Sequence, residues 1–536
     1  MQLNTWMSSS LPRLYPATPA PRIVPPLVLQ AALNEQCSFQ VGVRHFGPWP
    51  LKIRVEVPPQ SGIEVLIRRM GYVPVLHLTA IAEGADAELE GRGHIPGFVP
   101  DPLLPESALL LPSLETHAFW ITLFPNKSVT PGIKKIQVTV IPESGKPVLL
   151  TASVYYHPLA PGKRKNFHVT HWFYANALCD HYQTDFKDEK FWDLLEAYFT
   201  NMVEHGQNMI YVPALTPPIN GDTRPCQLLK IRKLKKGQYS FDWTDVGRYI
   251  SLAKKSGFTH FEWNHLFSQW GAAHPLRVYE SQGEKEKLLF SPQLPALSPE
   301  YRGFLEQYLP ELHRFSVGAG IFKKSFFHLS DEPHGPEQRT CYKAARDFLK
   351  GAAPWMSIMD ALSEIEFARE GLTDLPVAIE STVLQFVKEK IPALSYYCCV
   401  PRGGWLNHLL DTPLFFSAMH GFLHYRWPLR GYLHWGYNYW YKANTRKLIN
   451  PYLVTDAENW PNWASGDPFL VYPGSKGPID SMRWEIFKES MQDYALLQHR
   501  SVSAGGVLLR PIRSFEDFPK TEAWRDRLRL RLLNGK

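Results

Sequence analysis

The hydrophobic pattern of this chain changes its period near residue 160, and that change limits the folds open to it. Before that point, short segments such as 51–57 and 133–140 alternate between apolar and polar residues. A period of two predicts strands with one buried face, and the Pro and Gly residues between the segments predict turns. We therefore expect an N-terminal antiparallel β-sandwich over residues 1–160. The Pro-containing, basic segment 158–165 is interpreted as a linker.

After residue 165, apolar strand-like runs alternate with longer segments of helical period. Residues 190–205 carry apolar side chains at helical spacing between strand candidates at 167–174 and 209–212. Further strands are expected at 258–263 and 355–359. Ser298-Pro299 is expected to start a helix that Pro310 kinks or ends, and Pro478 is expected to open the last long helix. About eight such strands, each followed by a helix or a long loop, predict a (β/α)8 TIM-like barrel over residues 161–536 with a C-terminal helical tail. A doubly wound open sheet is the alternative. No GxGxxG follows the first strand and no GxxxxGK[ST] occurs, which argues against a nucleotide-binding version of that sheet.

Composition and charge narrow the classes of function. The chain has 536 residues and a net charge of +7, a mild excess for this length, so no nucleic-acid partner is expected. No apolar run approaches the roughly 18 residues of a membrane span. No secretory signal is visible at the N-terminus, so a cytoplasmic location is expected, with a secreted form that has lost its leader as the alternative. The six cysteines form no CxxC pair and are expected to be reduced, buried thiols. The oligomeric state cannot be read from the sequence.

Two adjacent carboxylates, Asp331 and Glu332, stand at the end of a predicted strand over 325–329, just before Pro333. In a (β/α)8 barrel the carboxyl ends of the strands face the active site, so both side chains are expected at its mouth. Neighbouring carboxylates repel each other, and one of them then keeps its proton near neutral pH, as a general acid must. The structural alternative is a turn residue followed by a solvated surface residue.

The adjacency of the two carboxylates also limits the mechanism. The carboxyls of a standard retaining glycosidase lie about 5 Å apart across the bond and usually come from different strands. Two neighbours on one strand are better suited to a reaction in which the 2-acetamido oxygen of the substrate is the nucleophile.

The aromatic cluster 431–441 is the second candidate feature, because it lies at the end of the last predicted strand. Sugar faces stack on aromatic rings and amides bond sugar hydroxyls, although core packing is the alternative. The candidate substrate-binding residues from this cluster and from other predicted strand ends are Trp435, Tyr437, Asn438, Trp440, Asp360, Tyr396, His265, Tyr211 and His171. The 20 histidines show no HExxH or other dense ligand spacing, and no GxSxG elbow occurs. Neither a metal site nor a serine nucleophile is predicted.

Several segments together resemble glycoside hydrolase family 123, the β-N-acetylgalactosaminidases and their relatives. Besides the Ser330 to Pro333 segment and the aromatic cluster, the matching positions are Asn34-Glu35, Ser38 to Gln40, Asp101 to Leu103, Trp120, Pro131-Gly132, Gly466 to Gly474, Gly477 to Ile479, Ser481, Arg483, Glu485 and Asp493-Tyr494. The resemblance implies an N-terminal β-sandwich followed by a (β/α)8 catalytic domain. It also implies substrate-assisted hydrolysis with retention, in which Asp331 orients the 2-acetamido group and Glu332 is the general acid and then the base. No cofactor is implied.

The sequence therefore predicts a retaining exo-glycosidase that removes terminal β-linked 2-acetamido-2-deoxy sugars, above all N-acetylgalactosamine, from an oligosaccharide or glycoconjugate. One alternative is a glycosidase for a non-acetamido glycoside, with carboxylates from separate strands such as Asp360, Glu262 or Glu380. The other is a non-catalytic glycan-binding protein on the same fold.

Overall fold

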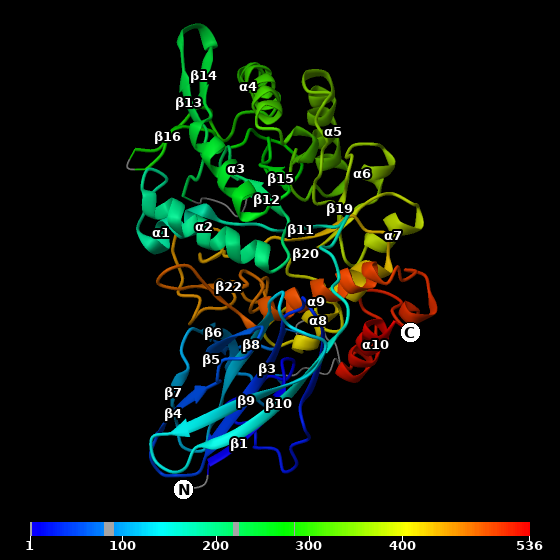
Figure 1. Cartoon of the computed structure of the whole chain (residues 1–536). Coiled ribbons are helices and arrows are strands. Elements are labelled where there is room, and N and C mark those ends of the chain that lie inside the picture. Colours follow the sequence, from blue (N-terminus) through cyan, green and yellow to red (C-terminus); the bar gives the residue numbers. More distant parts are fainter. Residues whose placement is uncertain (1–2, 80–90, 218–223, 284, 536) are drawn as a thin grey trace.

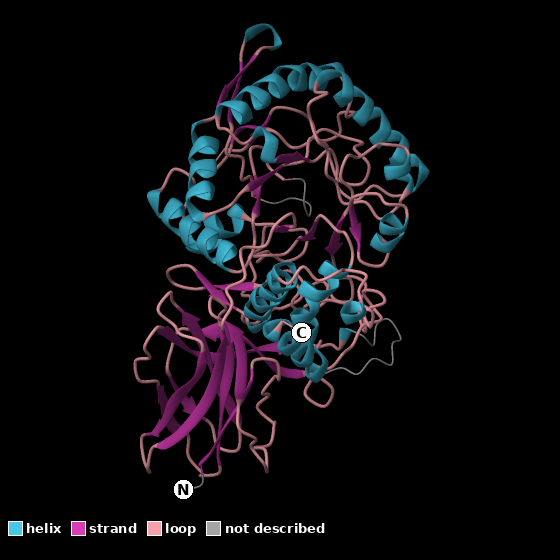
Figure 2. Ribbon diagram, turned by 45° about the vertical axis from the view of Figure 1, so that its right-hand side comes forward, coloured by secondary structure: helices cyan, strands magenta, loops and turns pink. Residues whose placement is uncertain are grey.

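The computed structural model describes residues 3–535 apart from 80–90, 218–223 and 284. A β-rich N-terminal region, blue to cyan in Figure 1, lies below a larger region in which helices surround short strands. Figure 2 shows these helices arranged around the strands of the second region.

The N-terminal region consists of two five-stranded sheets. The first has the order β1 (Leu3–Ser9), β3 (Cys37–His45), β8 (Thr116–Pro125), β5 (Ile63–Val75) and β6 (Gly97–Leu104). The second has the order β2 (Val28–Ala32), β10 (Val148–His157), β9 (Gly132–Pro142), β4 (Leu51–Glu56) and β7 (Ala108–Leu111).

The alternation of apolar and polar residues places one face of each sheet in a shared core. In β4, Leu51, Ile53 and Val55 are buried while the residues between them are exposed, and the core takes its side chains from both sheets. One pairing departs from the expected antiparallel arrangement, because β2 runs parallel to β10. These strands are far apart in sequence, so no short hairpin constrains their direction.

The second region contains two hydrogen-bonded parallel sheets. One has the order β11 (His168–His171), β21 (Gly431–His434), β20 (Leu394–Tyr397) and β19 (Val377–Ile379), and the other β12 (Met209–Val212), β15 (His260–Trp263) and β18 (Ser325–Phe327). Three two-stranded pieces are β13 (Lys230–Lys233) with β14 (Tyr239–Asp242), β16 (Tyr279–Ser281) with β17 (Lys287–Leu288), and β22 (Val471–Pro473) with β23 (Pro478–Asp480). The α-helices are α1 (Ala175–Tyr182), α2 (Glu189–Glu204), α3 (Thr244–Ser256), α4 (Pro299–Gly318), α5 (Gly335–Ala352), α6 (Glu366–Arg369), α7 (Val383–Lys388), α8 (Leu414–Arg426), α9 (Met482–His499) and α10 (Glu522–Asn534).

The two parallel sheets are joined by weaker contacts. Asn208 N, just before β12, donates to Val169 O of β11 at 3.2 Å, and single parallel bridges link Phe327 to Ile358 and Ala361 to Val377. The predicted strand at 355–359 is a short segment that pairs with β18, since Phe327 N donates to Ser357 O at 3.0 Å and Met359 N donates to Phe327 O at 2.8 Å. Just beyond it, Val377 N of β19 donates to Asp360 O at 2.9 Å. Backbone hydrogen bonds through this segment therefore connect the two parallel sheets.

A buried ion pair joins the two regions. Arg483 of α9 donates to Asp101 of β6, with Nε to Oδ1 at 3.0 Å and Nη2 to Oδ2 at 2.9 Å, and both side chains are fully buried. Tyr472 donates a third hydrogen bond to Asp101 at 2.7 Å. The pair is therefore dry and fully hydrogen-bonded, the condition under which loss of one partner is most costly.

Replacing Arg483 with Met is expected to lower the free energy of unfolding by about 3–5 kcal/mol, because Asp101 loses its hydrogen-bonded cation and keeps only the more distant Arg13, whose Nη1 is 3.8 Å from Oδ1. Urea titration followed by intrinsic fluorescence measures this change. The matched control is Arg513→Met, which removes an exposed ion pair with Asp517 and should change stability by less than about 0.5 kcal/mol. Equal stability of the two variants would contradict a structural role for the buried pair.

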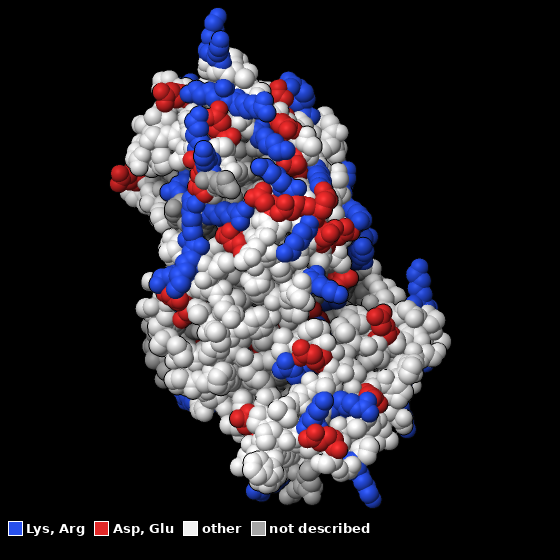
Figure 3. All heavy atoms as spheres, turned by 90° about the vertical axis from the view of Figure 1, so that its left-hand side faces the viewer, with Lys and Arg blue, Asp and Glu red and all other residues white. Residues whose placement is uncertain are grey.

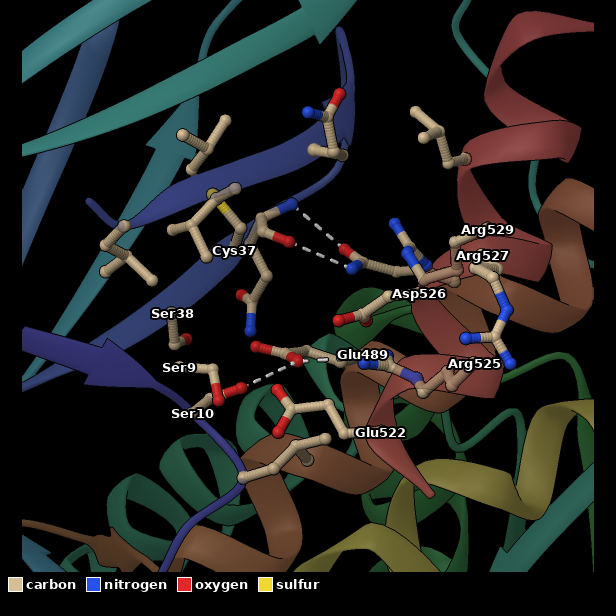
Figure 4. Close-up of a pocket in the computed structure, with 18 of the residues that line it drawn as sticks. Ser9, Ser10, Cys37, Ser38, Glu489, Glu522, Arg525, Asp526, Arg527 and Arg529 are labelled. Carbon is tan, nitrogen blue, oxygen red and sulfur yellow. Dashed lines mark hydrogen bonds and ion pairs between the residues drawn. The ribbon is translucent and has the colours of Figure 1, made fainter. Parts of the chain in front are cut away.

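Helices α9 and α10 also pack against the sandwich around a polar pocket of about 420 Å3 (Figure 4). At its edge, Ser10 Oγ donates to Glu489 Oε2 at 3.3 Å. Nearby, Arg529 of α10 pairs with the buried Glu35 carboxylate at 2.9 Å. The C-terminal helix is thus bound to the first domain by charge as well as by apolar packing.

The surface charge is mixed in sign where it can be seen. On the face in Figure 3, Lys and Arg side chains lie among Asp and Glu, mainly over the upper half. Within the part of the chain that the structure describes, no helix combines the length and apolar character needed to cross a membrane.

Candidate active site

Asp331 and Glu332 follow β18 at its carboxyl end, where the backbone turns sharply. Glu332 has a left-handed φ of 43°, and Trp270 N donates to Asp331 O at 2.8 Å. A left-handed non-glycine residue is held there only by its surroundings. This turn directs both carboxyls into one pocket instead of to opposite faces of a strand.

Each carboxyl has one neutral hydrogen-bond donor. Gln269 Nε2 donates to Asp331 Oδ2 and Tyr396 OH donates to Glu332 Oε1, both at 2.8 Å. Burial, followed by the charge of Glu332, raises the pKa of Asp331 to about 8. The charge of the nearby His328 opposes this rise without cancelling it, so Asp331 keeps its proton through the neutral range.

The pocket around the pair has a volume of about 180 Å3, and aromatic rings form part of its wall. Its lining comes from strands β20 and β21 and from loops that follow several different strands. Besides Asp331 and Glu332 it contains Trp172, Gln269, Trp270, Ala361, Tyr396, Cys398, Cys399, Leu433, Trp435, Asn444 and Trp463. Aromatic rings with a few converging polar groups are the composition of a site for a small polyhydroxylated ligand.

A buried hydrogen-bond network of His328, Glu262 and Asp360 holds the segment that leads from β18 to Asp331. His328 lies between two carboxylates, with Nε2 at 2.7 Å from Glu262 Oε1 and Nδ1 at 3.0 Å from Asp360 Oδ1. Burial alone would lower the pKa of His328, but the hydrogen bonds to Asp360 and Glu262 outweigh it and raise the pKa to about 9. Asp360 also accepts from Leu329 N at 3.0 Å. The network therefore fixes the backbone two residues before Asp331.

Comparison with known proteins assigns the chain to a family. Residues 172–500 match the description "Glycoside hydrolase 123, catalytic domain". The chain belongs to glycoside hydrolase family 123. Among solved structures, a family 123 glycoside hydrolase from Clostridium perfringens, studied for glycolipid glycan hydrolysis, is similar over 100% of this chain and 98% of that chain, with 14% sequence identity and a TM-score of 0.75. The match to a Bacteroides ovatus GH5 xyloglucanase in complex with a XXXG heptasaccharide covers 87% of this chain and 98% of that chain, with 8% identity and a TM-score of 0.33. No curated protein matches the chain.

The family 123 assignment confirms that this protein is an enzyme, a glycoside hydrolase. The C. perfringens structure also confirms the coarse architecture, a β-rich N-terminal region followed by a family 123 catalytic domain. At 14% identity the likeness supports the fold alone.

In this family 123 chain, Trp435 and Tyr396 line the pocket beside the carboxyl pair, whereas other members of the predicted set lie elsewhere. Asn438 is fully buried and binds Tyr174, with its Oδ1 at 2.8 Å from Tyr174 N. Trp440 and Tyr437 are also fully buried, and they donate to Val471 O and Asn201 Oδ1. These three residues therefore pack the region behind the pocket and do not line it.

The remaining predicted residues surround the network beneath the site. Tyr211 OH lies 3.2 Å from His265 Nδ1, and the His265 ring stacks on His328 with centroids 4.4 Å apart. Asp360 belongs to that network, and His171 is buried against Trp484. None of these four lines the pocket.

Sequence reasoning missed Gln269, Trp270, Asn444 and Trp463, which lie on loops without a periodic pattern. The only available signal was for Gln269 and Trp270, which follow the predicted strand 258–263 on the loop where a barrel places its site. The expectation of buried thiols is wrong for part of the set, because Cys37, Cys398 and Cys399 are partly exposed and Cys341 is exposed. Cys398 and Cys399 line the pocket.

Among the residues that the structure describes, three largely buried sets of side chains have ligand atoms within 4.8 Å of one another, close enough to share a metal ion. They are His265 with His328 and Asp360, His408 with His434 and Asp467, and His205 with Asp480 and Glu485. Each is already engaged in hydrogen bonds or ion pairs. For example, Arg68 binds both carboxylates of the third set at 2.7 and 2.8 Å.

Proposed function

We propose that this family 123 enzyme is a retaining exo-glycosidase that removes terminal β-linked 2-acetamido-2-deoxy sugars, with N-acetylgalactosamine as the preferred sugar. The observation that carries the proposal is the adjacent Asp331–Glu332 pair in a small aromatic pocket. The C. perfringens relative was studied for glycolipid glycan hydrolysis, and we propose that this chain also acts on a glycoconjugate. The bridged strands of the second region are interpreted as a distorted (β/α)8 barrel.

Substrate-assisted catalysis follows from the way the two carboxyls share one side of the pocket. Among the described residues that line the pocket, Asp331 and Glu332 are the only carboxylates, so we assign the attack at C1 to the acetamido oxygen. Asp331 accepts the amide N–H and stabilises the positive charge that develops on the oxazolinium ring. Glu332 donates its proton to the departing oxygen, then takes a proton from the water that opens the ring at C1.

Substrate binding redistributes the proton that the two carboxyls share. The amide N–H of the sugar favours an ionised Asp331, since a hydrogen bond to the charged form stabilises it. The proton is then carried by Glu332, where Tyr396 OH occupies only one of its oxygens. The free Oε2 is the atom from which we expect protonation of the leaving group.

The pH dependence of kcat/KM is expected to show a fall on the basic side with a midpoint near 8. Burial and the neighbouring charge raise the pKa of Asp331 to about 8, so the pair holds its proton below that pH and loses it above. Activity should then decline about tenfold per pH unit, since kcat/KM reports groups of the free enzyme. A fall centred near pH 4, where an ordinary carboxyl titrates, would contradict a shared proton.

Hydrolysis of chromogenic β-glycosides tests the proposal directly. We expect turnover of the β-N-acetylgalactosaminide, retention at the anomeric carbon by NMR, and inhibition by a thiazoline mimic of the oxazolinium ring. Substrates with a 2-hydroxyl in place of the acetamido group should be hydrolysed at least about 100-fold more slowly. Comparable rates on those substrates would contradict obligatory participation by the acetamido group.

A further inference from the structure

Two adjacent thiols form part of the pocket wall. Cys398 and Cys399 follow β20 immediately after Tyr397, and both line the cavity that contains Asp331 and Glu332. Their Sγ atoms are 3.9 Å apart. Neither thiol has a task in the proposed hydrolysis, so their placement at the sugar site calls for a separate explanation.

The backbone brings the two thiols together. Side chains of successive residues in a strand point to opposite faces, but Cys399 has a left-handed φ of 58° that breaks this alternation. The turn is held from two sides, because Cys399 N donates to Asp467 Oδ2 at 3.0 Å and Arg402 Nε donates to Cys399 O at 2.8 Å. Such a conformation in a non-glycine residue persists only when its surroundings fix it. The pair is therefore preorganised before any ligand binds.

The distance between the sulfur atoms distinguishes two uses of a thiol pair. A disulfide needs sulfurs about 2.05 Å apart and usually Cα atoms 4.4–6.8 Å apart, whereas neighbouring residues have Cα atoms only about 3.8 Å apart. Two sulfurs bound at about 2.3 Å to one tetrahedral zinc ion lie about 3.8 Å from each other. The observed 3.9 Å matches the metal geometry without movement.

We propose that Cys398 and Cys399 form a binding site for a thiophilic divalent cation such as Zn²⁺, and that the bound ion closes the sugar pocket. Each thiol releases its proton to solvent as its sulfur bonds to the ion, and the ion gives up two waters in exchange. Water completes the coordination. The Asp467 carboxylate, which accepts from Cys399 Sγ at 3.2 Å, loses that donor and keeps the hydrogen bonds from Cys399 N and Trp435 Nε1.

Occupation of this site has a direct steric consequence. The sulfurs lie in the wall of a cavity of only about 180 Å3, so an ion with its remaining waters takes space that a sugar ring needs. The predicted inhibition rests on the proposed function, whereas the binding of the ion does not.

Titration of the full-length reduced protein with Cd²⁺, a spectroscopic substitute for Zn²⁺, tests binding. We expect an ultraviolet thiolate-to-metal charge-transfer band that saturates at one ion per chain and disappears when Zn²⁺ competes. In wild type, Zn²⁺ should also protect Cys398 and Cys399 from alkylation by iodoacetamide, measured by peptide mass spectrometry. The exposed Cys341 is the internal control and should be alkylated equally with and without the ion.

Variants locate the site. The double variant Cys398→Ser/Cys399→Ser should lose at least about 100-fold in Cd²⁺ affinity, while Cys341→Ser should bind like wild type. Zn²⁺ should inhibit wild type and Cys341→Ser in a way that a chelator reverses.

Absence of a saturable band in wild type, or equal alkylation of all three thiols with Zn²⁺, would overturn the proposal even if the double variant failed to fold. A band that persists in a folded double variant would also overturn it, by assigning the ion to a cluster such as His408, His434 and Asp467. Inactivity of wild type on every glycoside would count against the proposed function, while the band and the alkylation pattern would still decide the cation site.

Discussion

Glu332→Gln is expected to lower kcat/KM on a natural glycoconjugate by about 10²–10⁴-fold, the range that a general acid contributes. The amide cannot donate a proton to the leaving oxygen, yet it keeps the size of the side chain and an oxygen that can accept the hydrogen bond from Tyr396 OH. The loss should therefore appear in catalysis and not in the shape of the pocket.

A comparison of substrates with different leaving groups distinguishes loss of the general acid from general damage to the site. A nitrophenyl glycoside has a leaving oxygen that needs little protonation, so its hydrolysis should fall much less than that of the natural substrate. The matched control is Glu337→Gln, the same chemical change at an exposed residue at the start of α5, and it should leave both rates unchanged. Equal activity of wild type and Glu332→Gln on the natural substrate would rule out Glu332 as the acid.

Asp331→Asn is expected to lower kcat on acetamido substrates by about 10²–10³-fold, comparable with the removal of one preorganised group that stabilises transition-state charge. The carboxylate that accepts the amide N–H and balances the oxazolinium charge is replaced by a neutral amide. Since both effects grow as the ring forms, kcat should fall more than KM rises.

Binding of the thiazoline mimic distinguishes the role of Asp331 from that of Glu332. Because this inhibitor imitates the closed ring, Asp331→Asn should lose affinity for it in parallel with kcat, while Glu332→Gln should bind it more nearly like wild type. Calorimetry with both variants provides the measurement. Unaltered inhibitor binding by Asp331→Asn would show that Asp331 does not contact the acetamido group.

Regular segments of the fold followed from local pattern. The alternation in β4 and the Ser298–Pro299 start of α4 both depend on neighbours in sequence, and in the structure Ser298 Oγ accepts from Tyr301 N at 3.4 Å. Pro310 was expected to kink or end α4, but the helix continues to Gly318. Buried apolar residues on both sides of it, including Leu309 and Leu312, favour the continuous helix despite the hydrogen bond that Pro cannot make.

The start of α9 could not be placed from the sequence alone, because residues 478–480 could form either the first turn of the helix or a strand. Pro478 was expected to open the helix, because Pro suits the first helical position. Instead 478–480 pairs with β22, and Ser481 caps a helix that begins at Met482 by accepting from Trp484 N at 3.1 Å. Pairing with a strand several residues away therefore decided where the helix begins.

The carboxyl pair was located by sequence, whereas most of the pocket wall was not. Asp331 and Glu332 follow a recognisable strand, so their place at its end could be predicted. Trp440 and Asn438 are residue types that often contact sugars, but both side chains are fully buried in the segment that follows β21. Which face of an aromatic cluster meets solvent is set by contacts between distant segments, and no local pattern encodes those contacts.

The ion pair between Glu35 and Arg529 joins residues that are 494 positions apart. During synthesis at about 5–20 residues per second, Glu35 waits on the order of a minute before its partner leaves the ribosome. Until then the side of the sandwich that later receives α9 and α10 is open to water, chaperones and proteases. The sandwich, although it is made before α9 and α10, is therefore among the last parts of the molecule to reach its final stability.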